Sequence, residues 1–303
     1  MLRALLGGLN AVPGVDITVM LDVRLVHELA PTDGKIALIG PQDDCFECFK
    51  QLAETVDAIW PIAPEFHAIL FTLCRAVEQL GKILLAPGAE AVRLAADKYE
   101  TFRCLARRHI PVVATWLLDE CVAFSKESIV KPIDGAGCND SYLVRDGGEF
   151  ERIAARLQGN GKYIIQPHLC GEKTSLSCLF KQNKGWLLSV NLQLFERVNE
   201  QYQLAAIQVN HRRDLTPYQE LVAGIAEAVP GLWGYAGIDL IETPEQTLVL
   251  EINPRLTSSF AGLNAALGIN PAALVLQLLD GDPVIRRTAN RTVTVHIKQE
   301  ADA

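Results

Sequence analysis

The segment 233–259, WGYAGIDLIETPEQTLVLEINPRLTSS, constrains the fold of this chain more than any other. Two runs rich in aliphatic residues, 238–241 and 247–252, flank the polar break 242–246, which contains Pro244. A polar break with proline between two such runs predicts a β-hairpin. We therefore expect an antiparallel pair of strands here.

Each run of this hairpin carries an acid, Asp239 in the first and Glu251 near the end of the second. Because side chains alternate between the faces of a strand, Glu251 and Asn253 point the same way, and Arg255 follows on the same side. Antiparallel pairing brings Asp239 close to them, and two carboxylates with an amide oxygen form a ligand set suited to magnesium. From these residues alone, a surface hairpin with ordinary charges and a structural Asn-Pro turn is the alternative.

A strand that carries a lysine lies upstream of the hairpin. The run 128–132, SIVKP, contains Lys131, and the loop 134–140 that follows contains Gly135 and Gly137. Glycines let backbone N–H groups approach phosphate oxygens without a Cβ clash. Taken alone, the loop is better explained as a hairpin turn, and the lysine as a side chain that extends out of the sheet.

A helical segment, 87–110, precedes that strand. Its apolar residues have helical spacing, and Asp97 with Glu100 forms a capping box that restarts the helix at Lys98. A solvated lysine in the first turn is the simple interpretation, although a positive charge is unfavourable at a helix start.

The order of these elements resembles the ATP-grasp ligases. It runs from Asp97-Lys98 through the Val-Lys-Pro strand, the glycine loop and the Gln-Pro-x-x-x-Gly-Glu segment at 166–172 to Asp239 and the Glu-x-Asn-Pro-Arg motif at 251–255. Each element is weak singly, but the ordered set is specific. The resemblance spans about residues 90–280.

The resemblance implies a role for each matching residue. The implied roles are phosphate contacts (Lys98, Lys131, Gly135, Gly137), hinge contacts to adenine and ribose (Gln166, His168, Leu169, Glu172), metal ligands (Asp239, Glu251, Asn253) and catalysis (Lys131, Arg255). The implied cofactors are ATP and two Mg²⁺ ions, with Mn²⁺ as an alternative. Lys173 stands where some relatives place the ribose acid, and His168 is equally a packing residue of the hinge. We expect the loop 134–140 to order over the phosphates when nucleotide binds.

Before residue 88 short strands alternate with helices, a rhythm typical of a small parallel sheet covered by helices. No G-x-G-x-x-G motif is present, so dinucleotide binding has little support. In the family this region resembles the pre-ATP-grasp domain, although its usual first strand and glycine-rich loop are missing from residues 1–20. Glu65 either interacts with a helix dipole or contacts substrate.

The sequence thus predicts a fold of α/β and α+β units. The resemblance implies an ATP-grasp fold with a small parallel-sheet pre-ATP-grasp domain at 1–88 and an ATP-grasp domain at 89–303. Within the second domain we expect a lid subdomain at about 122–185.

The composition argues against some classes of binding partner. The net charge is −8 and no long basic run is present, which argues against nucleic acid. No apolar segment approaches ~20 residues, so no membrane span is expected. The eight cysteines are not spaced as a disulfide framework, and Cys45 and Cys48 read as two thiols on a helix turn. The cysteine pattern predicts that the protein is located in a reducing cytoplasm.

The resemblance implies an ATP-dependent carboxylate–amine ligase that forms an amide through an acyl phosphate and releases ADP and phosphate. Its partners would be a small-molecule carboxylate and an amine, and a homodimer is allowed. Within the superfamily, the N-terminal helix, the Pro-Glu pair at 64–65 and the Arg-x-Thr-Ser-Ser ending most resemble the tyramine–glutamate ligases of methanofuran biosynthesis. The alternative is a non-catalytic ATP-binding sensor with the same fold.

Overall fold

A computed structural model describes residues 1–28, 34–135, 140–159, 161–198 and 201–297. Its α-helices are α1 (Leu2–Asn10), α2 (Cys45–Glu54), α3 (Ile69–Gln79), α4 (Ala89–Ala96), α5 (Lys98–Arg107), α6 (Gly147–Leu157), α7 (Thr216–Ala228), α8 (Phe260–Leu267) and α9 (Pro271–Asp280). Its strands are β1 (Thr18–Asp22), β2 (Lys35–Ile39), β3 (Ala58–Ile59), β4 (Ile83–Leu84), β5 (Trp116–Leu117), β6 (Ser128–Pro132), β7 (Tyr142–Val144), β8 (Tyr163–Pro167), β9 (Glu172–Lys181), β10 (Lys184–Val198), β11 (Gln201–Arg212), β12 (Gly234–Glu242), β13 (Thr247–Asn253) and β14 (Val293–His296).

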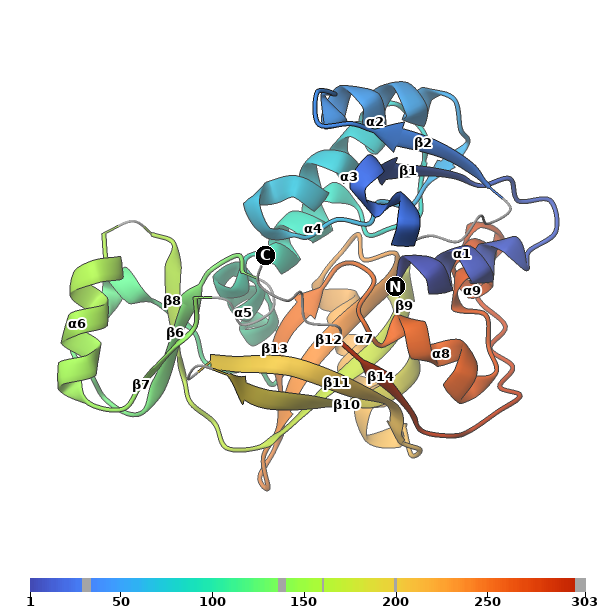
Figure 1. Ribbon diagram of the computed structural model, residues 1–303. Coiled ribbons are helices and arrows are strands. Elements are labelled where there is room, and N and C mark those ends of the chain that lie inside the picture. The colour runs from blue at the N-terminus through green and yellow to red at the C-terminus, as the bar shows by residue number, and fades with distance from the viewer. Residues whose placement is uncertain (29–33, 136–139, 160, 199–200, 298–303) are drawn as a thin grey trace.

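The largest sheet has six strands in the order β13-β12-β9-β10-β11-β14, and all neighbours are antiparallel (Figure 1). Alternation along the strands gives this sheet two different faces. Leu176 and Ile238 pack in one core with α7, whereas Leu179 and Tyr235 pack in another with α8. Asp239 has the parity of Tyr235, so its side chain lies on the α8 face of the sheet.

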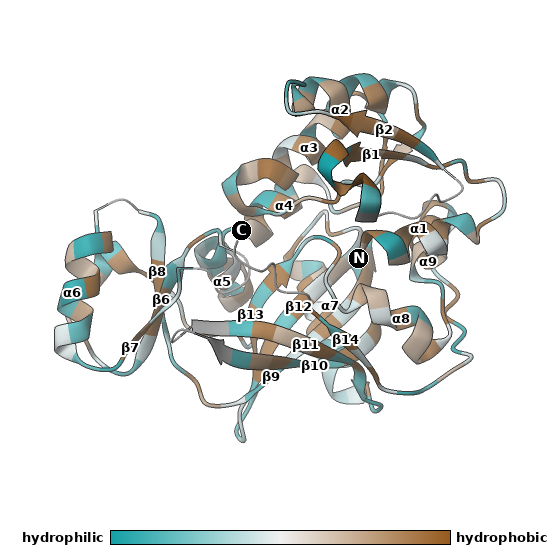
Figure 2. Ribbon diagram, viewed as in Figure 1, coloured by the Kyte–Doolittle hydropathy of each residue, from teal (hydrophilic) through white to brown (hydrophobic). Residues whose placement is uncertain are grey.

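A smaller sheet, in the order β5-β8-β6-β7, forms a separate unit with α6 at the left of Figure 1. Helix α6 shows both teal and brown residues in Figure 2, and its buried side chains Phe150, Ala154 and Leu157 join a core with Val130. Because β9 pairs in the large sheet, we propose that the lid subdomain comprises about residues 116–167.

The N-terminal unit contains two parallel strand pairs, β1-β2 and β3-β4. Helices α2 and α3 lie beside β1 and β2 in Figure 1. The expected parallel sheet is therefore confirmed, in two short pieces. Helix α1 packs instead against the C-terminal part of the chain: Leu5 and Leu9 share a core with α8 and α9, and the Asn270 side chain donates to the Gly8 carbonyl at 2.7 Å. In the described residues β1 is the first strand.

Several local predictions are confirmed. The hairpin of β12 and β13 turns through Thr243, and Asp97 ends α4 and caps α5 by accepting the Glu100 N–H at 2.8 Å. Cys45 and Cys48 are free thiols of α2. Strand β11 was not predicted.

No single helix among the described residues is long and apolar enough to cross a membrane, and only the pair α8 and α9, bent by 97°, passes that test together.

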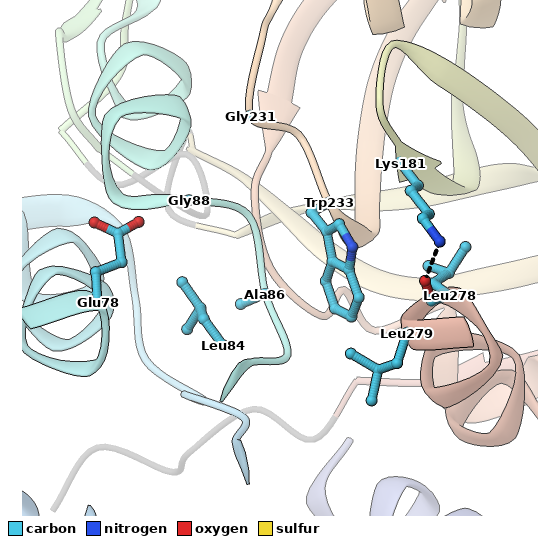
Figure 3. A pocket seen from close by; sticks show the side chains of 9 residues that line it. All are labelled: Glu78, Leu84, Ala86, Gly88, Lys181, Gly231, Trp233, Leu278 and Leu279. Carbon is cyan, nitrogen blue, oxygen red and sulfur yellow. Dashed lines mark hydrogen bonds between the residues drawn. The ribbon is translucent and has the colours of Figure 1, made fainter. Parts of the chain in front are cut away.

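A cavity of about 380 Å³ lies where the N-terminal unit meets the C-terminal helices (Figure 3). Its charged side chains already serve helix ends. Glu78 accepts the Ala89 N–H at 2.8 Å at the start of α4, and Lys181 Nζ donates to the Leu278 carbonyl at 2.5 Å near the end of α9. This cavity lies at a junction between structural elements. The predicted site residues do not line it.

The loop after β13 lies so close to β12 that only glycine fits opposite it. A Cβ added at Gly237 would meet Thr257 Cγ2 at 2.5 Å. We expect Gly237→Ala to lower the free energy of unfolding by about 1–3 kcal/mol, as in other overpacked sites. Gly7→Ala is the control: its Cβ would meet nothing within 4 Å inside helix α1, so stability should rise by about 0.5–1 kcal/mol. Urea denaturation measures both, and equal stability of Gly237→Ala and wild type would contradict this packing.

Candidate active site

The two hairpin acids face each other. Asp239 pairs with Glu251 across β12 and β13, and Asn253 lies opposite Gly237 two residues further on. The carboxyl groups of Asp239 and Glu251 are in hydrogen-bonding contact, and Gln193 on β10 donates to Asp239. The structure thus brings together the three predicted metal ligands on one face of the sheet.

The pKa values of the two acids are shifted in opposite directions. Burial raises the pKa of Asp239 to about 7, and the negative charge of Glu251 adds to the shift. Burial would also raise the pKa of Glu251, but the positive charges of Lys98, Lys131 and Arg255 outweigh it, so the pKa of Glu251 is lowered. Glu251 therefore remains anionic, whereas Asp239 retains a proton until near neutral pH.

Lys98 joins this cluster from the start of α5. The Asp97 cap ends α4 and turns the chain, which buries the Lys98 side chain. Its Nζ donates to the Gly135 carbonyl at 2.5 Å and lies 3.7 Å from Glu251 Oε2. The interpretation of Lys98 as a solvated lysine is therefore wrong: the side chain connects the beginning of the glycine loop to the acid pair.

Arg255 closes the opposite side of the cluster. Its guanidinium forms a two-bond ion pair with Glu65 of the N-terminal unit, with Nη2 2.9 Å from Glu65 Oε1. Nη2 also lies 3.5 Å from Asn253 Oδ1, and Nη1 donates to the Leu256 carbonyl at 3.2 Å. The sequence offered two roles for Glu65, and this contact with Arg255 was neither of them.

The hinge residues are placed in different environments. The side chain of Gln166 is buried and donates to Thr115 Oγ1 at 2.9 Å, and the ring of His168 lies 2.7 Å from a Glu127 carboxylate oxygen. Leu169 packs in an apolar cluster whose buried members are Val113, Ile241 and Leu248. Ile241 has the parity of Asp239, so this apolar surface lies two residues along β12 from the acid pair, on the same face.

Glu172 lies on the other face of the sheet. It pairs in register with Glu242, whereas Ser175 pairs with Asp239, so its side chain has the opposite parity. The Glu172 carboxylate forms an ion pair with Arg212, which also contacts Glu242 at 3.2 Å on the side of α7. The neighbouring Lys173 has the parity of the site, with its Nζ 4.4 Å from the centre of the Phe195 ring.

Polar side chains continue from the acid pair into the sheet. Asn191 donates to Ser177 Oγ at 3.1 Å and accepts from Ser189 at 2.6 Å, and the hydroxyl of Tyr235 links Ser177 to Thr257. Asn191 and Gln193 therefore both have hydrogen-bond partners on this face of the sheet, as buried polar side chains require. This network attaches the loop after β13, which carries Arg255, to the centre of the sheet.

The donor set suits magnesium better than a transition metal. It consists of two carboxylates and one amide oxygen, which are hard ligands. Among the described residues no three His, Cys, Asp or Glu side chains lie together as a metal site, so Asn253 would have to supply the third ligand. Burial and the negative charge of Glu251 raise the pKa of Asp239, and a bound cation would favour its ionised form. Gly135 lies at the edge of this site, and Gly137, with most of the predicted flap, lies outside the described residues.

Comparison with known families agrees with this arrangement. The model of the ATP-grasp domain matches residues 95–259, more than half of the chain, and the model of the pre ATP-grasp 3 domain matches residues 15–92. The chain belongs to the ATP-grasp family. The predicted family and fold are thereby confirmed.

The relatives of this ATP-grasp protein include carbon–nitrogen ligases. It is 25% identical over 243 residues to the tyramine–L-glutamate ligase of Methanocaldococcus fervens, a match that covers 80% of this chain and 73% of the relative. The corresponding ligase of Methanocaldococcus jannaschii is 26% identical over 211 residues, covering 70% of this chain but only 59% of the relative.

Solved structures show the same fold. An ATP-grasp superfamily protein from Archaeoglobus fulgidus superposes with a TM-score of 0.68 at 23% identity, covering 93% of this chain and 79% of that protein. Biotin carboxylase from Campylobacter jejuni, solved as a β-γ-ATP complex, gives a TM-score of 0.76 at 15% identity, covering 94% of this chain and 69% of that protein. An L-amino acid ligase from Bacillus licheniformis gives 0.66 at 17% identity, covering 87% and 68%.

We expect the Asp239 carboxylate to lower the stability of the fold but to be needed for metal binding. The pKa of Asp239 is raised to about 7 in the folded state, so the unfolded state releases this proton at lower pH than the folded state does. The free energy of unfolding therefore falls as the pH rises from about 4 to 7. Asp239→Asn should therefore raise the free energy of unfolding at pH 8 by roughly 1–3 kcal/mol, and the gain should vanish near pH 4. The same variant should lose the rise in Tm that MgADP gives the wild type.

Thermal and urea denaturation across this pH range measure the effect. Asp16→Asn, at an exposed position before β1, is the matched control and should show neither change. A less stable Asp239→Asn variant at pH 8 would contradict the repulsion between the two carboxylates.

Proposed function

We propose that this chain is an ATP-dependent carboxylate–amine ligase that forms an amide through an acyl phosphate and releases ADP and phosphate. The observation that carries the proposal is the convergence of Lys98, Lys131 and Arg255 on the facing carboxylates Asp239 and Glu251. Three cations and two carboxylates around one point suit a polyphosphate with its magnesium ions, because the cations bind phosphate oxygens and the carboxylates bind metal.

The apolar cluster beside the acid pair is the proposed adenine position. Leu169 packs against Ile241 and Leu248, which form an apolar cluster on the same face as Asp239. A nucleotide that lies along β12 would place its base there and its phosphates near Lys98 and the Gly135 backbone. Of the predicted hinge residues, Leu169 fits such a contact directly, and Gln166 and His168 support the hinge through Thr115 and Glu127.

The chemistry follows from the leaving group. A carboxylate cannot acylate an amine because oxide is a very poor leaving group, whereas phosphate is a good one. Magnesium, held by Asp239, Glu251 and Asn253, would neutralise charge on the triphosphate as the carboxylate approaches. Lys98 and Lys131 would orient the phosphates, and Arg255 would stabilise the transferring phosphoryl group, so that positioning and electrostatics supply most of the rate.

The relatives suggest the substrates. Two tyramine–L-glutamate ligases match across most of this chain, and we propose glutamate as the carboxylate and tyramine or a similar amine as its acceptor. The pathway of methanofuran-type cofactors is the corresponding setting. A non-catalytic nucleotide sensor is the competing function, and it would bind MgATP without consuming it in response to a carboxylate and an amine.

A phosphate-release screen with pairs of amino acids and amines separates these functions. We expect ADP and phosphate to appear in step with the amide. AMP and pyrophosphate would indicate an adenylate instead and would contradict the proposed acyl phosphate. ATP binding without turnover for any pair would favour the sensor.

Glu251 is the residue on which the scheme depends most, because it lies between Asp239 and Lys98. Glu251→Gln preserves side-chain size and should retain the fold, yet lower kcat at least ~100-fold, the scale seen when a key electrostatic stabiliser is removed. Asn253→Ala should lower kcat by a smaller factor. Glu245→Gln, exposed at the turn of the same hairpin, is the control and should keep full activity. A Glu251→Gln variant with wild-type kcat would refute this role.

A further inference from the structure

The turn at residues 64–68 of the N-terminal unit is strained where it meets the active site. His67 and Ala68 both have positive φ values, 53° and 56°, before helix α3 begins at Ile69. Left-handed backbone at non-glycine residues costs of order 1–3 kcal/mol each, and it persists only where the surroundings hold it in place. This strain calls for contacts that hold the turn in this shape.

Two contacts join this turn to residues around the acid pair. Glu65 forms the two-bond ion pair with Arg255, which is 190 residues away in the sequence. The His67 N–H donates to Asp134 Oδ2 at 3.2 Å, immediately before Gly135 of the glycine loop. The N-terminal unit therefore touches both the arginine that follows the metal ligands and the loop that receives Lys98.

The ion pair leaves Arg255 little freedom. A guanidinium has five N–H donors. Four of them serve Glu65 twice, Asn253 once and the Leu256 carbonyl once. The side chains of Arg255 and Glu65 are only 20% and 8% exposed, so solvent screens the pair weakly. The guanidinium plane is thus fixed beside Asn253, and among the described residues the fifth N–H has no acceptor.

A helix-capping role does not explain Glu65. Its side chain forms no capping hydrogen bond with the short 3₁₀ turn Phe66–Ala68 that follows it. The simpler alternative is that the ion pair is purely structural. Removing one partner of a buried ion pair destabilises a protein whether or not the pair has a functional role. The two interpretations differ in what Arg255 does when Glu65 loses its charge.

We propose that Glu65 is a positioning residue, which holds the Arg255 guanidinium so that its remaining N–H serves the transferring phosphoryl group. The inference rests on the proposed ligase function and adds to it a requirement for the N-terminal unit. Phosphoryl transfer then depends on docking of the turn 64–68, because Arg255 is fixed only while Glu65 is in place.

Steady-state kinetics of Glu65→Gln and Glu65→Asp test this role. We expect Glu65→Gln to lower kcat on the order of 100-fold, the cost of a small misplacement of a catalytic group. The KM for ATP should stay within about threefold, because Lys98 and Lys131 are untouched. Glu65→Asp, which keeps the charge, should retain more kcat than Glu65→Gln. The control is Glu78→Gln, another acid of the N-terminal unit, which should retain wild-type kcat.

Two further measurements separate positioning from stability and from the function itself. The ¹H–¹⁵N resonance of Arg255 Nε, assigned by its loss in Arg255→Lys, should shift in Glu65→Gln but not in Glu78→Gln. Unchanged kcat in Glu65→Gln, or a loss of kcat that merely follows the fraction unfolded, would overturn the proposal. If the wild type turned over no substrate, the ligase function would fail, and an Nε resonance unchanged in Glu65→Gln would still overturn the positioning role.

Discussion

The architecture of the site depends on the burial of two facing carboxyl groups, Asp239 and Glu251, in contact with each other. Two such groups cannot both ionise in a half-buried place unless positive charge surrounds them. The chain supplies that charge from three elements far apart in sequence: the start of α5, strand β6 and the loop after β13. The same arrangement that compensates the acids would, in the proposed function, also bind a polyphosphate, so that stability and binding would depend on one set of cations.

The parts of the fold that rest on local physics could be read from the sequence. The hairpin of β12 and β13, the pairing of its acids and the capping of α5 by Asp97 follow from alternation, turn chemistry and a capping box. Burial of Lys98 could not be read in this way, because it depends on the approach of Gly135 and Glu251. Nor could strand β11, in which polar residues interrupt the apolar pattern.

Parity explains the most instructive difference within the site. Glu172 and Lys173 are adjacent, and a shift of one residue in a strand exchanges the faces of the sheet. The pairing of Glu172 with Glu242 places it toward α7, with Arg212, while Lys173 shares the face of Asp239. A motif match fixes the order of residues but not their parity, because parity depends on where the strand begins to pair. Contacts such as Glu65 with Arg255 are still less accessible, since nothing local links positions 190 residues apart.

The buried polar network gives the site its rigidity. Buried hydroxyl and amide groups destabilise a sheet unless each finds a partner, and here Ser177, Asn191 and Tyr235 form a hydrogen-bonded chain beside the acid pair. A purely apolar face would stabilise the sheet as well, but it would leave the loop after β13 without directional contacts. Through Thr257 the network fixes where that loop leaves the strand, and through Glu65 the N-terminal unit fixes where Arg255 points. Arg255, a charged side chain on a short loop, is thereby held from two independent directions, which its proposed role in stabilising charge on a reacting phosphate would require.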